Sequence, residues 1–289
     1  MDWTRDLPGW PLQDLSRRVR CRPHEWHVQE AGTGQTILLL HGAGGATHSW
    51  RDLLPALAEG YHAVAIDLPG QGFTRAGTRR RLGLSQMSSD IASLCAAQGW
   101  HPRAIIGHSA GAAIALDLAG RLAGPGGDPP GVVGINAALD RFDGIAGWLF
   151  PALAKLLALN PLTASAFTLG RNHAARAQRL IESTGSHINA TGLTCYARLF
   201  SDRPHVDATL QMMAQWNVDA LVARLPEATG RCLLLTGSRD SAVSPEVSRR
   251  AAARMPRCET GDLGPLGHLA HEEAPAETLR HITGWLARG

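Results

Sequence analysis

The chain has 289 residues, of which 44% are hydrophobic, and its formal net charge is +3. This length suits one large α/β domain, or one domain with an insert, and is ample for a buried core. The weak charge and the lack of an aromatic-studded basic sheet or a helix-turn-helix pattern argue against nucleic-acid binding. The apolar stretches are too short for a membrane span, and no spacing is typical of a metal site.

The cysteines and the start of the chain indicate a cytoplasmic protein. Five cysteines lie far apart without a C-x-x-C pair, which favours reduced thiols over a disulfide framework. Residues 1–6 are charged and lack the apolar core of a signal peptide.

Two arginine clusters are compatible with an anionic ligand or an acidic partner, although a solvated basic face explains them more simply. They comprise Arg17, Arg18, Arg20 and Arg22, and Arg75, Arg79, Arg80 and Arg81.

The first half of the chain alternates short apolar strands with helices after an irregular arm over residues 1–16. Alternating side chains predict a hairpin that turns at Pro23-His24. The expected strands are 17–21, 25–30, 35–40, 62–66, 104–106 and 132–135, and the expected helices are 48–58, 85–98 and 112–118.

This rhythm breaks after residue 139 and resumes near residue 232. The segment 141–216 reads as mostly helical and contains no clear strand. Strands then follow at 232–235 and 259–263, with helices at 245–255 and 274–286. Alternating strands and helices predict a mostly parallel sheet with helices on both faces. We therefore expect a core of residues 1–140 and 217–289, with 141–216 as a helical cap.

Gly107-His108-Ser109-Ala110-Gly111 is a G-x-S-x-G sequence between an expected strand and a small-residue helix. In this context the sharp turn exposes the serine hydroxyl, and the two glycines leave room for the tight backbone. The alternative is a chance glycine-serine turn, which would not require a strand before Gly107 and a helix after Gly111. The motif predicts that Ser109 is a nucleophile.

A serine nucleophile needs a base, and the base needs an orienting acid. Asp240 follows the strand 232–235, and His268 lies in a glycine-rich loop after the last strand, so both reach the same sheet edge as Ser109. His271 is a weaker candidate because it would open a helix. Asp140 and Asp143, after the preceding strand, are the rival acids.

Two preorganised amides should hold the oxyanion that forms during acyl transfer. We expect the first to be the amide of Ala110, which follows the nucleophile. The second should come from the turn His41-Gly42-Ala43-Gly44-Gly45, with the Ala43 amide as the best candidate.

The same turn has a competing interpretation as a dinucleotide-binding loop. Gly42 and Gly44 precede a helix, and Asp67 ends the next strand. However, Thr47 occupies the third glycine position, and a partial G-x-G is a weak signal. That interpretation also leaves the serine, histidine and aspartate pattern unexplained.

Together these residues resemble the α/β-hydrolase superfamily over nearly the whole chain. The resemblance implies a mostly parallel eight-stranded sheet, with a helical cap inserted after the sixth strand. It is carried by His41-Gly42-Ala43-Gly44, Asp67-Leu68-Pro69-Gly70-Gln71-Gly72, the Ser109 turn, the Asp240 turn and Gly267-His268.

Within that superfamily the chain most resembles the BchO-type family of magnesium-chelatase accessory proteins in bacteriochlorophyll synthesis. The similar stretches are 15–19, 26–29, 47–51 and 67–74. This resemblance implies a pathway in photosynthesis rather than a reaction. Gln71 stands where many relatives have histidine, at a position that is not catalytic.

These observations predict a serine hydrolase that works through an acyl-enzyme and needs neither cofactor nor metal. The expected substrate is an ester, and the BchO resemblance implies a tetrapyrrole ester and magnesium-chelatase subunits as partners. An apolar roof over a flat substrate is one role for the cap side chains, although simple packing is the plainer one. Those side chains are Trp148, Phe150, Phe167, Leu169, Tyr196 and Phe200.

Two alternatives stay open. The first is a non-catalytic porphyrin-binding or chelatase accessory protein, with the loop 75–81 at the edge of the site meeting porphyrin propionates. The second keeps the serine turn for other chemistry, such as carbon–carbon cleavage or perhydrolysis, because a fold alone does not fix a function.

Overall fold

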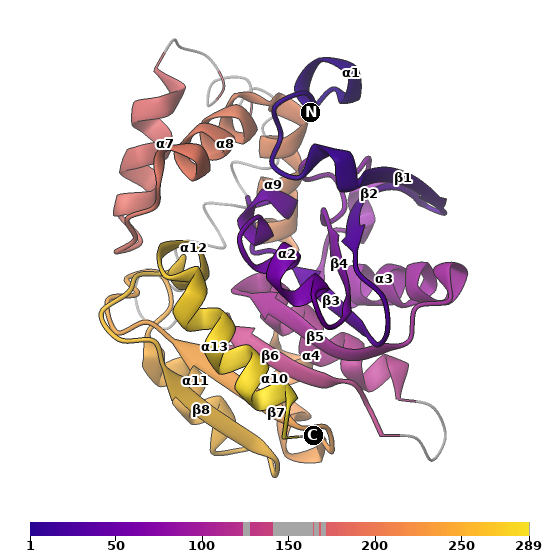
Figure 1. Ribbon diagram of the computed structural model, residues 1–289, viewed down its shortest axis with the longest axis vertical. Coiled ribbons are helices and arrows are strands. Elements are labelled where there is room, and N and C mark those ends of the chain that lie inside the picture. The colour runs from indigo at the N-terminus through magenta and orange to yellow at the C-terminus, as the bar shows by residue number, and fades with distance from the viewer. Residues whose placement is uncertain (124–127, 141–163, 165–167, 169–171, 289) are drawn as a thin grey trace.

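The computed structural model describes residues 1–123, 128–140, 164, 168 and 172–288. One sheet of eight strands runs through the molecule in the order β1-β2-β4-β3-β5-β6-β7-β8 (Figure 1). Its first two strands are antiparallel and the other six are parallel to one another. The strands are β1 (Ser16–Cys21), β2 (His24–Ala31), β3 (Thr36–Leu40), β4 (His62–Ile66), β5 (Pro102–His108), β6 (Gly131–Ile135), β7 (Cys232–Thr236) and β8 (Cys258–Asp262).

Helices cover both faces of the sheet, because its central strands are apolar on both sides. Alternate side chains of β3 separate into two cores: Leu38 and Leu40 belong to one, and Ile37 and Leu39 to the other. The first core includes residues of α3 (Leu84–Gln98), α4 (Ala110–Leu122), α10 (Asp219–Ala223) and α11 (Pro245–Ala252). The second includes residues of α2 (Leu53–Ala58) and α13 (Pro275–Leu286). The predicted fold class is confirmed.

The predicted helix over 48–58 is wrong at its centre. It consists of a 3-10 turn η2 (Thr47–Trp50) followed by α2. Pro55 lacks an N–H, and its ring would clash with the carbonyl of Arg51 in a continuous helix. The helix therefore restarts at Leu53, which places Pro55 in its first turn.

The amino-terminal arm holds two short helical turns, α1 (Trp3–Asp6) and η1 (Gln13–Leu15). Trp10 lies between them and is buried with Phe73, Tyr196 and Leu199 in a third apolar cluster. This cluster joins the arm to the helices that follow β6.

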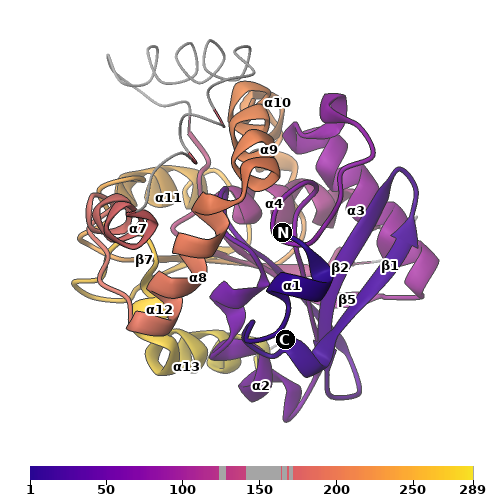
Figure 2. The same ribbon diagram turned by 90° about the horizontal axis from the view of Figure 1, so that it is seen from above.

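Three helices occupy the described part of the predicted cap: α7 (His173–Glu182), α8 (Ala190–Ser201) and α9 (Arg203–Ala214). They lie together at one end of the molecule, beside the arm (Figures 1 and 2). Side-chain caps from Asn172, Asn189 and Asp202 begin them. The boundaries at 141 and 216 stay a prediction.

Three short helical turns outside the cap complete the fold: η3 (Arg79–Arg81), η4 (Leu225–Glu227) and α12 (Ala270–Glu273).

Among the described residues, no helix combines the length and the apolar character needed to cross a membrane.

Candidate active site

Ser109 occupies the sharp turn between β5 and α4. Its backbone has φ 52° and ψ −116°, a conformation that costs energy for a residue with a side chain. A Cβ added at Gly107 would overlap the backbone of Gly111, and one added at Gly111 would overlap the backbone of Leu40. Gly107 is therefore required for β5 and α4 to meet so closely, and Gly111 for α4 to approach the end of β3.

His268 and Asp240 are joined directly. The His268 Nδ1 and an Asp240 carboxylate oxygen are 2.7 Å apart. The other Asp240 oxygen accepts the backbone N–H groups of Ala242 and Val243, each at 2.8 Å. The Asp240 side chain is fully buried, whereas the His268 side chain is 12% exposed. This arrangement fixes the Nδ1 proton toward Asp240 and leaves Nε2 to accept a proton.

His108, the residue before Ser109, connects the Ser109 turn to the loop that carries His268. His108 Nε2 donates to the backbone carbonyl of His268 at 2.8 Å, and the two rings lie 4.7 Å apart between centroids. Burial lowers the pKa of His108 well below its usual value, so the ring stays neutral. No hydrogen bond between described residues joins the Ser109 hydroxyl to the His268 ring; such bonds are often formed only with substrate present.

Asn136 connects the turn before Asp240 with the loop that carries His268, and it directly follows the residue that binds the Ser109 turn. This residue was not identified from the sequence. Its side-chain N–H group donates to the carbonyls of Gly267 and His268, at 3.0 and 2.8 Å, and its side-chain oxygen accepts the Gly237 N–H at 2.9 Å. The Ser109 N–H donates at 2.9 Å to the carbonyl of Ile135, the residue before Asn136. Asn136 has φ 47°, a left-handed conformation that asparagine tolerates better than most residues. Its place at the end of β6 was the one available signal.

The turn over 41–45 passes close to Ser109. A Cβ on Gly42 would lie 2.7 Å from His108 Nδ1 and 3.1 Å from the Ser109 Cβ. Ala43 is exposed at this turn, and its amide has no hydrogen-bond partner among the described residues. The same is true of the Ala110 amide, which lies at the start of α4 where helices leave N–H groups unpaired.

Gly44 is held on both sides of its peptide. Its N–H donates to the Gln71 side-chain oxygen at 2.7 Å, and its carbonyl accepts from His205 Nε2 at 3.2 Å. The other His205 nitrogen accepts the Gly72 N–H at 3.0 Å. Burial lowers the pKa of His205 to about 4, which keeps the ring neutral and able to accept. Gln71 and His205 thus position the turn, a role that the sequence did not indicate for either residue.

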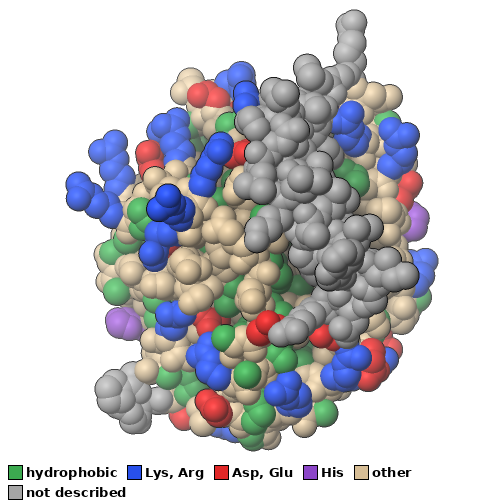
Figure 3. Space-filling view, turned by 180° about the vertical axis from the view of Figure 1, so that it is seen from behind, with side chains coloured by type: hydrophobic (Ala, Val, Ile, Leu, Met, Phe, Trp, Pro, Cys, Tyr) green, Lys and Arg blue, Asp and Glu red, His purple; other side chains and the backbone are tan. Residues whose placement is uncertain are grey.

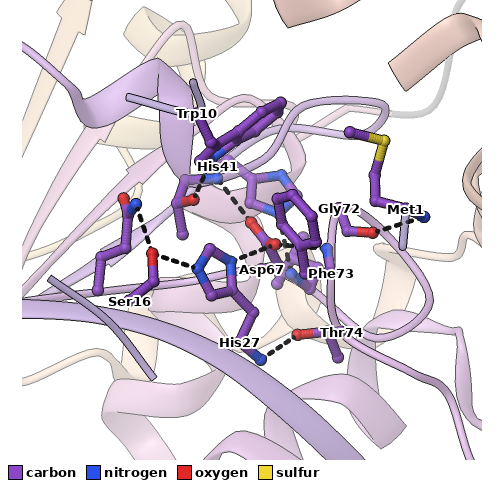
Figure 4. Close-up of polar contacts among 12 residues, drawn as sticks. Met1, Trp10, Ser16, His27, His41, Asp67, Gly72, Phe73 and Thr74 are labelled. Atoms are coloured by element: carbon purple, nitrogen blue, oxygen red, sulfur yellow. Dashed lines mark hydrogen bonds and ion pairs between the residues drawn. The ribbon is translucent and has the colours of Figure 1, made fainter. Parts of the chain in front are cut away.

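Both carboxylate oxygens of Asp67 form hydrogen bonds that hold the loops around the site together (Figure 4). One carboxylate oxygen contacts His27 Nδ1 and the Phe73 N–H, and the other accepts the Thr47 N–H, each at 2.7 Å. Burial opposes ionisation, but His27 and these N–H donors outweigh it and lower the pKa of Asp67 far below its usual value. Because its oxygens are occupied, Asp67 does not offer the free acid that the dinucleotide interpretation required.

The rival residues have other partners. His271 is buried between the rings of Trp50 and His108, with centroids 4.9 and 4.6 Å away. Burial lowers the pKa of His271 to about 3. Asp140 forms an ion pair with Arg250, and Asp143 lies outside the described residues.

A buried ion pair anchors α8 beside the histidine loop. Arg51 contacts Glu272 at 2.5 Å, and the Tyr196 hydroxyl donates to the same carboxylate at 2.8 Å. Tyr196 is therefore buried against the core rather than free to form a roof. Phe200 lies near Gly44, with its ring 3.9 Å from a Cβ built there. The other expected roof residues, Trp148, Phe150, Phe167 and Leu169, lie outside the described residues.

Within the described ranges, no group of three or more His, Cys, Asp or Glu side chains could hold a metal ion.

Residues 35–275 match the family model of the alpha/beta hydrolase fold. Two solved structures share the architecture. The epoxide hydrolase CorEH has a TM-score of 0.79 at 19% identity, over 94% of this chain and 98% of that one. A thermophilic esterase from Thermogutta terrifontis has a TM-score of 0.74 at 18% identity, with the same coverage. The chain belongs to the alpha/beta hydrolase fold family.

Within that family the chain is similar to the magnesium-chelatase 30 kDa subunit of Rhodobacter capsulatus. The two are 41% identical over 285 residues, which cover 98% of each protein. This finding confirms the BchO-type resemblance seen in the sequence.

Proposed function

We propose that the chain is a serine hydrolase in which Ser109 is the nucleophile, His268 the base and Asp240 the orienting acid. The observation that carries this proposal is the 2.7 Å contact between Asp240 and His268 Nδ1, in a loop bonded directly to the Ser109 turn. A serine on a strained turn, beside a histidine with a buried carboxylate partner, is the arrangement that acyl transfer requires.

The reaction proceeds through an acyl-enzyme. As the Ser109 oxygen attacks the ester carbonyl, its proton passes to His268 Nε2, and Asp240 stabilises the resulting imidazolium. The Ala43 and Ala110 amides hold the oxyanion. The alcohol then leaves with the proton from His268. Water next gives a proton to His268 and attacks the acyl group. The bond from the acyl carbon to the Ser109 oxygen then breaks, the acid leaves, and His268 returns the proton to Ser109.

The substrate we propose is a tetrapyrrole ester of bacteriochlorophyll synthesis, handled in the cytoplasm in association with magnesium-chelatase subunits. The relative named as a magnesium-chelatase subunit supports the pathway and the partners. Five free cysteines support a reducing compartment.

A fluorophosphonate probe tests the nucleophile, because it labels only an activated serine. We expect the wild type and a Ser93→Ala variant to be labelled, and a Ser109→Ala variant to remain unlabelled. Ser93 is a matched control since it is exposed on α3, away from the turn. An unlabelled but folded wild type would contradict the proposal.

A second candidate is a non-catalytic accessory protein for magnesium chelatase. It is favoured by the relative's name, which is that of a magnesium-chelatase subunit. A Ser109→Ala gene placed in a deletion strain separates the two functions. Loss of pigment supports the hydrolase, whereas full restoration of pigment supports the accessory role.

A further inference from the structure

The two arginine clusters of the sequence form one surface, because the β1–β2 hairpin is bonded to the loop 75–77. Glu25 and Arg75 exchange two backbone hydrogen bonds, at 3.1 and 2.8 Å. The Gly77 N–H donates to His24 Nδ1 at 3.2 Å. These bonds hold the hairpin tip against a segment about fifty residues further along the chain.

The pairing places the arginine side chains on a common face. Arg20 lies opposite Glu25 in the β1–β2 register, and Glu25 lies opposite Arg75. Residues directly opposite each other point to the same side of a sheet, as do residues two apart in a strand. Arg18 therefore shares this side, and its guanidinium lies 3.6 Å from Glu25. Arg22 at the hairpin tip and Arg79 and Arg80 in η3 are exposed and close in sequence to this side, and we group them with it. The arginine face is thus defined as Arg18, Arg20, Arg22, Arg75, Arg79 and Arg80.

This arginine face carries more positive charge than the whole chain. Two carboxylates pair with it, Glu25 with Arg18 and Asp207 with Arg79, which leaves a net charge of +4. The chain as a whole has +3, so the remaining residues sum to −1. Figure 3 shows Lys and Arg side chains gathered at the upper left, the side on which β1 lies when Figure 1 is seen from behind. Lys and Arg side chains also occur elsewhere on this view, but the excess of positive over negative charge lies on the arginine face.

The unpaired arginines suit carboxylates. Arg20, Arg22, Arg75 and Arg80 make no ion pair with any residue that the structure describes. A guanidinium binds a carboxylate through two parallel hydrogen bonds, and this geometry favours Asp and Glu side chains of a partner. β1 is the outermost strand of the sheet, so its outer edge pairs with no other strand.

We propose that the arginine face docks an acidic surface of a protein partner. A membrane surface would call for apolar anchors among the arginines. Of the described residues, the one large exposed hydrophobic side chain is Leu180, on α7, and α7 lies far from β1 (Figure 2). Single-stranded nucleic acid would call for exposed aromatic rings on which bases stack. Trp26 is buried beneath the hairpin, and Trp3 is covered by Arg18 at 4.5 Å.

The arginine face adjoins the candidate site through α9. Arg79 contacts Asp207 on this helix at 2.7 Å. His205, two residues earlier on α9, holds the Gly44 carbonyl. A partner on the arginine face would therefore lie beside the helix that positions the turn 41–45.

The test compares two charge-matched variants for binding to purified magnesium-chelatase subunits, each measured by calorimetry at low and high salt. The choice of these subunits rests on the proposed association with magnesium chelatase. The face variant carries Arg20→Gln, Arg22→Gln, Arg75→Gln and Arg80→Gln. The control carries Arg249→Gln, Arg254→Gln, Arg280→Gln and Arg288→Gln, which are exposed on α11, on α13 and just after these helices.

We expect one subunit to bind the wild type, with an affinity that falls as salt rises. The face variant should bind at least about tenfold more weakly, and the control should stay within about twofold of the wild type. Equal weakening of both variants, no weakening of either, or no binding of any subunit would overturn the proposal. So would binding of phosphatidylserine vesicles or of a single-stranded RNA through the arginine face when no subunit binds. Fluorophosphonate labelling of both variants reports on Ser109 independently, so failure of the docking surface and failure of the hydrolase remain distinguishable.

Discussion

At the scale of single residues, the positions of the three candidate catalytic side chains at one sheet edge could be predicted from the sequence. The residues that hold the surrounding turns in place could not. Ser109, Asp240 and His268 each follow a strand, and parallel strands end at one edge, so local sequence sufficed. Asn136, Gln71 and His205 act through contacts with segments tens to more than a hundred residues away. Apart from the place of Asn136 at the end of β6, nothing in their own neighbourhoods reveals those contacts.

Replacing Asn136 by alanine should lower both stability and turnover. The change leaves the Gly237 N–H without its acceptor in a buried site, which costs about 1–3 kcal/mol. It also frees the histidine loop, so kcat should fall further than the loss of folded protein explains, with little change in KM. Urea unfolding and ester hydrolysis measure the two effects. Asn217→Ala, at an exposed position, is the control; equal effects of both variants would argue against a positioning role.

Asp240→Asn should reduce kcat by a factor on the order of 10³–10⁴, because an amide favours the wrong histidine tautomer. Asp140→Asn is the matched comparison, since Asp140 follows β6 and pairs with Arg250 instead. Its kcat should stay near that of the wild type. Steady-state hydrolysis of an ester that the wild type accepts measures both. A larger loss from the Asp140 change would transfer the acid role to that residue.

At the scale of elements, helix and strand positions were largely readable, and the exception had a local cause. Apolar runs predicted β3, β4 and β7, whereas the helix over 48–58 was interrupted by Pro55, whose cost sequence periodicity did not weigh. How α8 attaches to the core was not readable. That attachment depends on Arg51 and Glu272, which are far apart in the chain.

Glu272→Gln should destabilise the fold by roughly 3 kcal/mol, because it leaves Arg51 charged and poorly paired in a buried place. The Tyr196 hydroxyl keeps an acceptor in this variant, so the loss reports mainly on the ion pair. The free energy of unfolding in urea is the measurement. Glu277→Gln, which breaks an exposed pair with Arg280, should change it little. A similar small effect at Glu272 would show that the buried pair contributes little.

At the scale of the whole molecule, alternation of strands and helices predicted the layered fold, but not which surfaces come together. The arginine clusters were visible as two separate runs. Their union depends on the hairpin tip meeting the loop 75–77, a contact set by the register of β1, β2 and residue 75. Such long-range contacts leave no periodic pattern in the sequence.

The protein should lose stability in mild acid. Burial lowers the pKa of His205 to about 4 and of His271 to about 3, and it also lowers the pKa values of His41, His48 and His108. Below about pH 6.5 these histidines bind protons in the unfolded chain but stay neutral in the folded chain. The stabilisation is therefore complete above this pH and declines as the pH falls toward 4.

Each such histidine adds about 1.4 kcal/mol per pH unit to the slope within this window. Urea unfolding between pH 7.5 and 4.5 measures the decline. In a His205→Gln variant, the free energy of unfolding should fall less steeply with pH, by an amount that corresponds to about one bound proton. A midpoint that does not move with pH would contradict the assignment of buried neutral histidines.

The His268 loop is held by its backbone as well as by the contact of its ring with Asp240. His108 and Asn136 both donate to the His268 carbonyl, and these two bonds do not depend on the side chain at position 268. Architecture and chemistry are consequently separable in this protein. Under the proposed mechanism, a substitution at position 268 removes the base while these backbone bonds stay in place. A single substitution can therefore separate the proposed catalytic role from the proposed binding role.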